Sequence, residues 1–356
     1  MAAYFVDPVN GSDSSYDGLS PTVDGGGVGP FKTLQVAANN ALAGSDIYCM
    51  NTGPDVPASA ILFNTNASSI TSRVRVFGAD ATGAPLLGTG SFTIDASGSS
   101  SAGIEFATIT QYTEFHDIDI VDGTSFGVRF TDGTPYVLFN RCNIRTCASD
   151  GVKSYTVNGV QTFRDCNIHS NAGYGFNINV NTNGNYRVYG CRVYDNGAAG
   201  IRGAGDFTGF VVIHDSLIYR NTAAGILIGN NAYASIVGNT LYGNTGAGLS
   251  ISPGAHTWVL ENSIAKNGAN GIYWGATQLV VYGNHYHDNT LDEWGGVGAG
   301  VSTEYGRLTG DPMFARVTAG SEMLEPARGS PLGRSITGRN QDAGAMQYAG
   351  HPERLL

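Results

Sequence analysis

The chain has 356 residues, of which 13% are charged, and a formal net charge of −10. This acidic balance offers no basic excess for non-specific binding to nucleic acid or to an anionic membrane. It also contains no run of about 18 apolar residues that could cross a bilayer. We therefore expect neither nucleic acid nor membrane as a partner. The 51 glycines are typical of a fold with many turns.

Residues 1–56 are predicted to form an N-terminal cap. Tyr4–Asp7 is predicted to be a strand, and 25–30 a flexible glycine-rich loop. A short helix is predicted before Gly44, because apolar residues recur there at helical spacing: Phe31, Leu34, Ala38, Ala41 and Leu42. Such a helix would cover the open apolar end of a first coil. Residues 57–112 are predicted to form irregular coils, with strands near 61–63, 74–76, 92–94 and 103–106.

One pattern then recurs eight times between Phe115 and Asn289. Its opening apolar residue stands at Phe115, Phe139, Phe163, Val188, Ile213, Ile236, Val259 and Val281, in steps of 24, 24, 25, 25, 23, 23 and 22 residues. The position eight residues later is mostly asparagine, and a glycine follows four residues after that. A fixed period of this length is the mark of a solenoid.

Each repeat contains short alternating runs such as Gly-Phe-Asn-Ile, which indicate strands and not helices. A unit of about 24 residues makes one coil of roughly three short strands, stacked on the next by parallel pairing. The asparagine column is predicted to occupy a tight corner, because Asn tolerates the left-handed conformation. The glycine column is predicted to mark a bend where a Cβ would be crowded. The predicted fold is an all-β, single-domain parallel β-helix.

After Asn289 the repeat ends. We expect a loop at 291–300, a last partial coil at 300–301 and a C-terminal cap. The predicted organisation is a cap at 1–56, a β-helix at 57–300 and a C-terminal cap with a tail at 301–356. Cys142, Cys166 and Cys191 share one column three residues after the opening position. We predict that they form a buried stack of reduced thiols, and a disulfide within the column is the alternative.

The repeat resembles the right-handed, pectate-lyase-like β-helix superfamily. The N-terminal segment is also similar to a signature found on β-helix proteins of bacteria and phages: Tyr-Phe-Val-Asp, Asn-Gly-Ser-Asp, Asp-Gly-Leu-Ser-Pro and Phe-Lys-Thr-Leu-Gln. Segments at 311–314, 329–332 and 342–347 resemble the closing sequence of the same subgroup. The resemblance identifies a fold subgroup and leaves the activity open.

Function in a solenoid lies on outward columns, and two such columns stand out. The first follows the opening residue by six positions and includes Arg145, His169, Tyr194, Tyr219 and Tyr242. It could bind sugar rings or a protein partner, or its aromatic residues could simply stiffen the coils.

The second column follows the glycine by two positions and includes Arg129, Lys153, Arg202 and Tyr273. Its cations could bind the carboxylates of an acidic polysaccharide. In a β-elimination, Lys153 and Arg129 would be the catalytic pair, one residue taking the proton and the other neutralising the uronate carboxylate. The alternative is that these cations pair with acids such as Asp132, Asp150 and Asp206.

Pectate lyases of this fold use a cluster of acidic calcium ligands beside a basic residue, and this sequence has no matching cluster on adjacent coils. A calcium site at Asp117 and Asp119 is the alternative to our expectation of no cofactor and no metal. Polygalacturonase-type hydrolases need paired aspartates and a Gly-His-Gly segment, which is missing here.

Three interpretations remain. The sequence favours a non-catalytic virion surface protein of a tailed phage, either capsid-decorating or tailspike-like. Its N-terminus lacks the basic and apolar segments of a signal peptide, which favours the virion over an extracellular protein whose signal was removed. The expected partners are two further copies in a homotrimer, a major capsid protein and a polysaccharide. The alternatives are a polysaccharide lyase or depolymerase acting on an acidic glycan, and a glycan-binding adhesin.

Overall fold

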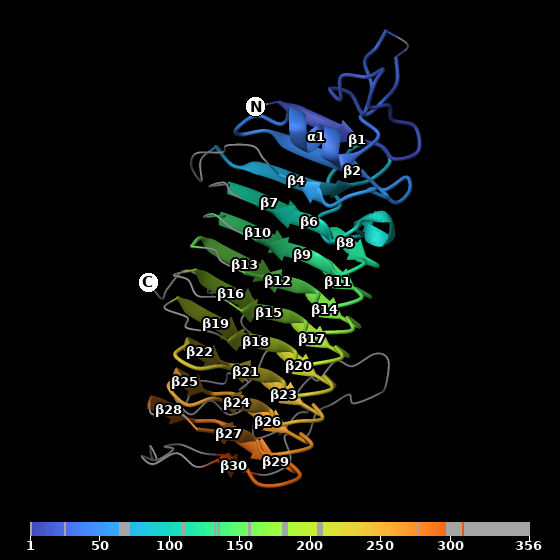
Figure 1. The fold of residues 1–356 in the computed structure, drawn as a ribbon. Helices are drawn as coiled ribbons and strands as arrows, with labels where there is room; N and C mark the ends of the chain where they lie inside the picture. Colours follow the sequence, from blue (N-terminus) through green and yellow to red (C-terminus); the bar gives the residue numbers. More distant parts are fainter. Residues whose placement is uncertain are drawn as a thin grey trace. The chain divides into compact units, whose positions relative to one another are not determined.

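The computed structural model shows an all-β right-handed parallel β-helix (Figure 1). It describes residues 2–24, 26–63, 72–107, 112–131, 133, 136–155, 158–179, 184–204, 209–275, 278–296 and 308–309. The chain divides into an N-terminal unit, Met1–Arg187, and a C-terminal unit, Val188–Leu356. In each unit, three parallel sheets, here named A, B and C, form the sides of the coil.

In the N-terminal unit, each coil from β4 onward contributes one strand to each sheet. Sheet A contains β1 (Ala3–Val6), β2 (Asp46–Met50), β4 (Val74–Ala79), β7 (Tyr112–His116), β10 (Tyr136–Asn140) and β13 (Val160–Arg164). Sheet B contains β5 (Phe92–Asp95), β8 (Ile118–Val121), β11 (Asn143–Arg145) and β14 (Asn167–His169). Sheet C contains β3 (Ile61–Leu62), β6 (Ala102–Phe106), β9 (Phe126–Phe130), β12 (Val152–Ser154) and β15 (Phe176–Asn179).

The C-terminal unit repeats this arrangement. Sheet A contains β19 (Phe210–His214), β22 (Tyr233–Val237), β25 (His256–Leu260) and β28 (Gln278–Tyr282). Sheet B contains β17 (Arg192–Tyr194), β20 (Leu217–Tyr219), β23 (Thr240–Tyr242), β26 (Ser263–Ala265), β29 (His285–His287) and β31 (Leu308–Thr309). Sheet C contains β18 (Ile201–Ala204), β21 (Ile226–Ile228), β24 (Leu249–Ile251), β27 (Ile272–Trp274) and β30 (Trp294–Gly295). Strand β16 (Asn185–Tyr189) spans the division.

The pairing register follows the sequence period, which confirms the predicted solenoid. Phe139 pairs with Phe115 on one side and with Phe163 on the other. Their rings stack at 4.7 and 5.0 Å inside the coil, and all three are buried. The predicted strands near 61–63, 74–76, 92–94 and 103–106 are present as β3, β4, β5 and β6.

The predicted capping helix is α1 (Leu34–Asn40), and it packs against β1, β2 and β3. Its buried residues are Leu34, Ala37 and Ala38, whereas Leu42 is exposed beyond its end. Among the described residues, no helix is long and apolar enough to cross a bilayer. Two short strands follow Asn289, of which β30 lies where a loop was expected. The motifs predicted for the C-terminal cap lie outside the described residues.

The prediction that Asn occupies the left-handed corners is wrong. The left-handed residue lies one position earlier, as at Asp195 (φ 54°), Arg220 (φ 53°) and Lys266 (φ 53°). This shift turns the following Asn side chain into the coil, where Asn221 and Asn244 are buried. Their amides bond from coil to coil, Asn221 Nδ2 donating to Asn244 Oδ1 at 3.0 Å. The column is therefore an internal amide ladder that satisfies backbone groups at the bend.

The predicted crowding at the glycine column is confirmed. A Cβ on Gly225 would lie 2.7 Å from the carbonyl oxygen of Gly248 and 2.8 Å from Asn244 Nδ2. Any larger residue would push against the backbone and the amide ladder of the next coil. All five cysteines are free and buried, as predicted. Burial raises the pKa of the Cys142 thiol.

Candidate functional site

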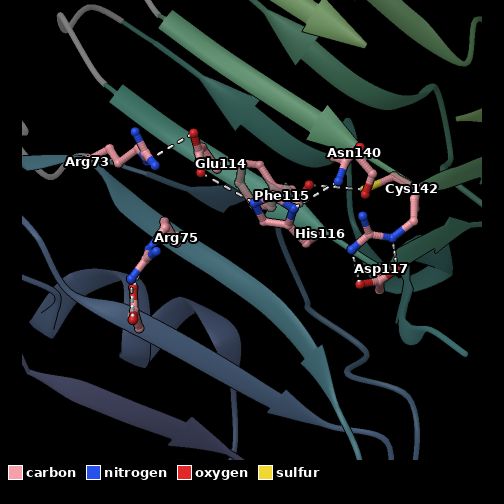
Figure 2. Close-up of polar contacts among 10 residues, drawn as sticks. Arg73, Arg75, Glu114, Phe115, His116, Asp117, Asn140 and Cys142 are labelled. Carbon is pink, nitrogen blue, oxygen red and sulfur yellow. Dashed lines mark hydrogen bonds and ion pairs between the residues drawn. The ribbon is translucent and has the colours of Figure 1, made fainter. Parts of the chain in front are cut away.

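The richest polar surface lies on sheet A of the N-terminal unit, at its border with sheet B. The outward residues of β7 flank the buried Phe115, and they are Glu114 and His116. In register with them, β4 contributes Arg75 and Phe77, and β10 contributes Asn140. Figure 2 shows the side chains of Arg75, Glu114, His116 and Asn140 on adjacent strands.

His116 is held by three contacts. Its Nε2 lies 3.3 Å from Glu114 Oε2, and Asn140 Nδ2 donates to its Nδ1 at 3.2 Å (Figure 2). The ring also stacks on Phe77, with centroids 4.9 Å apart. Because Nδ1 accepts a hydrogen bond from an amide, the neutral imidazole carries its proton on Nε2. Glu114 is therefore placed to stabilise a positive charge on the ring.

Glu114 also forms an ion pair with Arg73, with Arg73 Nε 3.0 Å from Glu114 Oε1. Burial acts to raise the pKa of the Glu114 carboxyl, but the His116 hydrogen bond and the nearby cations outweigh it, and the pKa is lowered. Arg75 binds Asp46 through two hydrogen bonds of 2.7 and 2.6 Å, which raise the pKa of its guanidinium.

Two further ion pairs continue this surface, one at the corner between sheets A and B and one on sheet B. Arg141 binds Asp117 at the corner through bonds of 2.9 and 2.8 Å, which raise the pKa of Arg141. Arg145 binds Asp119 at 3.3 and 2.9 Å, and Asn143 donates to the same carboxylate at 2.9 Å. We call Arg73, Arg75, Arg141 and Arg145 the arginine strip.

Each pair of the arginine strip exposes its cation and hides its anion. The side-chain exposures are 37% against 16% for Arg73–Glu114, 32% against 14% for Arg75–Asp46, 36% against 1% for Arg141–Asp117 and 36% against 10% for Arg145–Asp119. A guanidinium has five N–H donors, and a bidentate carboxylate uses two of them. The surface therefore presents oriented guanidinium groups although the chain as a whole is acidic.

The predicted calcium site at Asp117 and Asp119 does not fit this arrangement. Asp117 has a left-handed backbone (φ 59°) before β8, which breaks the strand alternation that would place the two carboxylates on one face. Both oxygens of each carboxylate accept from an arginine. No group of three potential metal ligands occurs in the part of the chain that the structure describes.

The structure brings the predicted pair Lys153 and Arg129 together on sheet C, in register on β12 and β9. Each has an acidic neighbour. Arg129 bonds Glu105 at 2.7 Å, and Lys153 Nζ lies 4.0 Å from Asp150 and 5.1 Å from the centre of the Tyr155 ring. Lys153 is buried, and its ammonium group lies between Asp150 and the Tyr155 ring. Asp132 and Asp206 lie outside the described residues.

In the other predicted column, Arg145 lies in register with His169, whose Nδ1 is 3.0 Å from Ser170 Oγ. Tyr219 stacks on Tyr194 at 4.8 Å and 9° and is buried together with Leu217, with Tyr242 packed beside them. Arg220 lies over both rings of the Tyr194–Tyr219 stack, at 5.9 and 5.0 Å. The rings of Tyr194 and Tyr219 therefore contact each other and the Arg220 guanidinium, and sugar binding by this column stays a prediction.

Arg202 and Tyr273 lie on sheet C of the C-terminal unit, on β18 and β27, with β21 and β24 between them. The structure does not bring them together. The sequence analysis missed Glu114, His116 and Asn140. These residues directly precede or follow the opening apolar positions Phe115 and Phe139. Strand alternation around those positions could have placed them on the outer surface.

A profile of the family described as "Right handed beta helix region" matches residues 59–208 and 202–308, which is more than half of the chain. The chain belongs to the right-handed β-helix family. This result confirms the predicted right-handed β-helix fold. Comparison with curated proteins finds no match.

Several solved structures share the fold at low sequence identity. The pectate lyase Pel9A is 17% identical with a TM-score of 0.72, and the alignment covers 97% of this chain and 96% of that one. A lacto-N-biosidase of family GH136 from Eubacterium ramulus is 10% identical with a TM-score of 0.56, covering 86% and 68%. A rhamnogalacturonan lyase is 13% identical with a TM-score of 0.53, covering 81% and 82%.

Proposed function

We propose that this protein binds an acidic polysaccharide along the arginine strip and cleaves it by β-elimination beside His116. The supporting observation is the asymmetry of the four ion pairs, in which the carboxylates are less exposed than the guanidinium groups that they orient. Guanidinium groups in a fixed orientation match the bidentate geometry of uronate carboxylates. The lyases among the structures of similar fold act on polysaccharides by their names, which agrees with this proposal.

The proposed reaction removes the proton next to the uronate carboxylate. The arginine strip would neutralise that carboxylate, so that negative charge can develop on it. His116 Nδ1 would take the proton once substrate displaces the Asn140 amide, and Glu114 would stabilise the resulting imidazolium through Nε2–H. The C5–H and C4–O bonds break and a C4–C5 double bond forms. The leaving oxygen takes up a proton from water, and the imidazolium of His116 returns the abstracted proton to solvent.

The test is incubation with a panel of uronate polymers, with the absorbance of the unsaturated product as the readout. We expect His116→Gln to reduce the rate by about 100-fold or more while polymer binding, measured by affinity electrophoresis, is retained. A chelator should leave the rate unchanged, because arginines occupy the carboxylates of Asp117 and Asp119. Absence of product and of binding with every polymer would refute the proposal.

Lys153→Gln is the matched control, because Lys153 lies on sheet C and outside the arginine strip. We expect it to keep both binding and turnover. Loss of turnover in Lys153→Gln, with turnover intact in His116→Gln, would move the active site to the Arg129–Lys153 row and overturn the assignment made here.

A non-catalytic virion protein, capsid-decorating or tailspike-like and trimeric, is the second candidate. The observation that favours it is the N-terminal signature, whose Asp13 carboxylate accepts from the backbone of Lys32 and Thr33 just before α1. This segment resembles caps of phage and bacterial β-helix proteins. A mass measurement in solution tests the assembly, and a stable monomer would count against the trimer.

A further inference from the structure

We infer that the outer surface of sheet A in the C-terminal unit is a binding site for neutral sugars, with the indole of Trp258 as its platform. This inference does not depend on the proposed lyase activity. The surface is formed by β19, β22, β25 and β28. It includes Phe210, Tyr233, His256, Trp258, Val280 and Tyr282, and four of these six are among the exposed large hydrophobic residues of the chain.

Trp258 has no aromatic residue beside it in the pairing register. Its neighbours in register are Ser235 and Val280, neither of them aromatic. By contrast, Tyr233 stacks on His256 at 4.6 Å and 9°, so that those rings cover one another.

The indole of Trp258 instead approaches an aromatic ring two strands away. Its ring centre is 5.9 Å from that of Phe210, although Phe210 belongs to β19 and β22 lies between the two strands. Two strand spacings amount to about 9.6 Å, so the two rings lean toward one another across β22. Trp258 is 40% exposed. An indole with this much exposed surface can pack against the C–H face of a sugar ring.

Polar groups surround this platform without adding charge. His214 Nε2 lies 3.0 Å from the Oγ of Ser235, the residue paired in register with Trp258, and Tyr233 and Tyr282 of the same sheet are both exposed. Burial lowers the pKa of His214 to about 4, so this ring is neutral at pH 7. None of the outward side chains described on these four strands belongs to Asp, Glu, Lys or Arg. This surface therefore matches an uncharged ligand, unlike the arginine strip.

The size of the surface favours a sugar over a second copy of the chain. Three outward columns on four strands cover roughly 200–300 Å² by strand geometry. A stable protein interface buries about 800 Å² on each partner. The area corresponds better to a short oligosaccharide, which needs an aromatic platform and a few hydroxyl partners.

The experiment is calorimetric titration of the full chain with neutral hexasaccharides of glucose, xylose, mannose and galactose. We expect at least one of them to bind, and Trp258→Ala to weaken that binding by about tenfold or more. Tyr273→Ala is the matched control, because Tyr273 is equally exposed but lies on sheet C, and it should bind normally. His116→Gln should also bind normally, which separates this site from the proposed lyase site.

Three results would overturn the inference. The first is the absence of binding by every hexasaccharide up to about 10 mM. The second is an unchanged affinity in Trp258→Ala. The third is a wild-type oligomer that Trp258→Ala converts to monomer, because the surface would then be a contact between copies.

Discussion

The two units build the same coil with different chemistry. In the N-terminal unit, the corner three residues after the opening position holds Ile118, Cys142 and Cys166, all buried and apolar. In the C-terminal unit, the same corner starts with Cys191 and Ser216 and continues with Asn239, Asn262 and Asn284, which are joined by side-chain amides. A β-helix corner can therefore be filled either by packed apolar side chains or by a complete hydrogen-bond network.

The outer surfaces of the two units also differ in charge and in aromatic content. The N-terminal unit carries buried carboxylates that hold exposed arginines, whereas sheet A of the C-terminal unit is uncharged and aromatic on its described outward positions. The inner cores differ as well. Phenylalanine rings stack at the opening position of the first unit, and Ile213, Ile236 and Val259 fill it in the second.

The largest expected effect on stability comes from removing one side-chain amide from the ladder. Asn262 Nδ2 donates to Ile236 O and to Asn284 Oδ1, and its Oδ1 accepts from the backbone and side chain of Asn239. Asn262→Ala should reduce the free energy of unfolding by about 3 kcal/mol or more, because it leaves several buried groups unpaired. Cys142→Ala, in the same column of the other unit, should cost only about 1 kcal/mol. Urea titration measures the free energy of unfolding of both variants. Equal losses would contradict the expected difference between the hydrogen-bonded corner and the apolar corner.

A smaller effect is expected from the ion pairs. Arg141→Ala leaves Asp117, which is 1% exposed, without its counterion, and we expect a loss of about 2–3 kcal/mol. Arg220→Ala breaks a pair whose Asp195 is 39% exposed, and the loss should stay below about 1 kcal/mol. Adding Asp117→Asn to Arg141→Ala should restore stability, since the buried charge is then gone. A double variant as unstable as Arg141→Ala would show that packing, and not charge, is responsible.

The smallest effect concerns the pH dependence of stability in the C-terminal unit. Burial raises the pKa of Asp215 from 3.8 to about 7. Below about pH 4 the carboxyl is protonated in both the folded and the unfolded chain, so Asp215→Asn should have no effect there. Between about pH 4 and 7 the unfolded carboxyl ionises first, and the wild type loses stability relative to the variant.

At pH 8 we expect Asp215→Asn to be more stable than the wild type by about 1–2 kcal/mol, allowing for partial solvent screening. Thermal unfolding at pH 4 and pH 8 measures the difference. Asp288→Asn is the control, because Asp288 is exposed at a similar left-handed corner (φ 52°) and should show no pH-dependent gain. A gain of the same size at both pH values would mean that backbone preference, and not ionisation, explains the effect.

The sequence period predicted the fold, the strand positions and the crowded glycines because these depend on residue type and spacing alone. It misplaced the Asn column because the left-handed corner residues vary among Asp, Thr, Ser, Arg, Gly and Lys, so that they carry no common signature. It correctly predicted that Arg129 and Lys153 lie side by side on adjacent strands. It missed His116, because the partners of that residue come from three separate coils and only pairing register shows that they meet.

The amide ladders also have a direction. In the bonds between Asn side chains, each amide donates to the Asn of the following coil and accepts from the Asn of the preceding coil, from Asn239 through Asn262 to Asn284. A segment copied from one coil of this unit and inserted after it would find the same donors and acceptors on both sides. The C-terminal unit is therefore suited to lengthening by internal duplication, and the mixed corners of the N-terminal unit are not. The number of coils in this protein could change in evolution mainly through its second half.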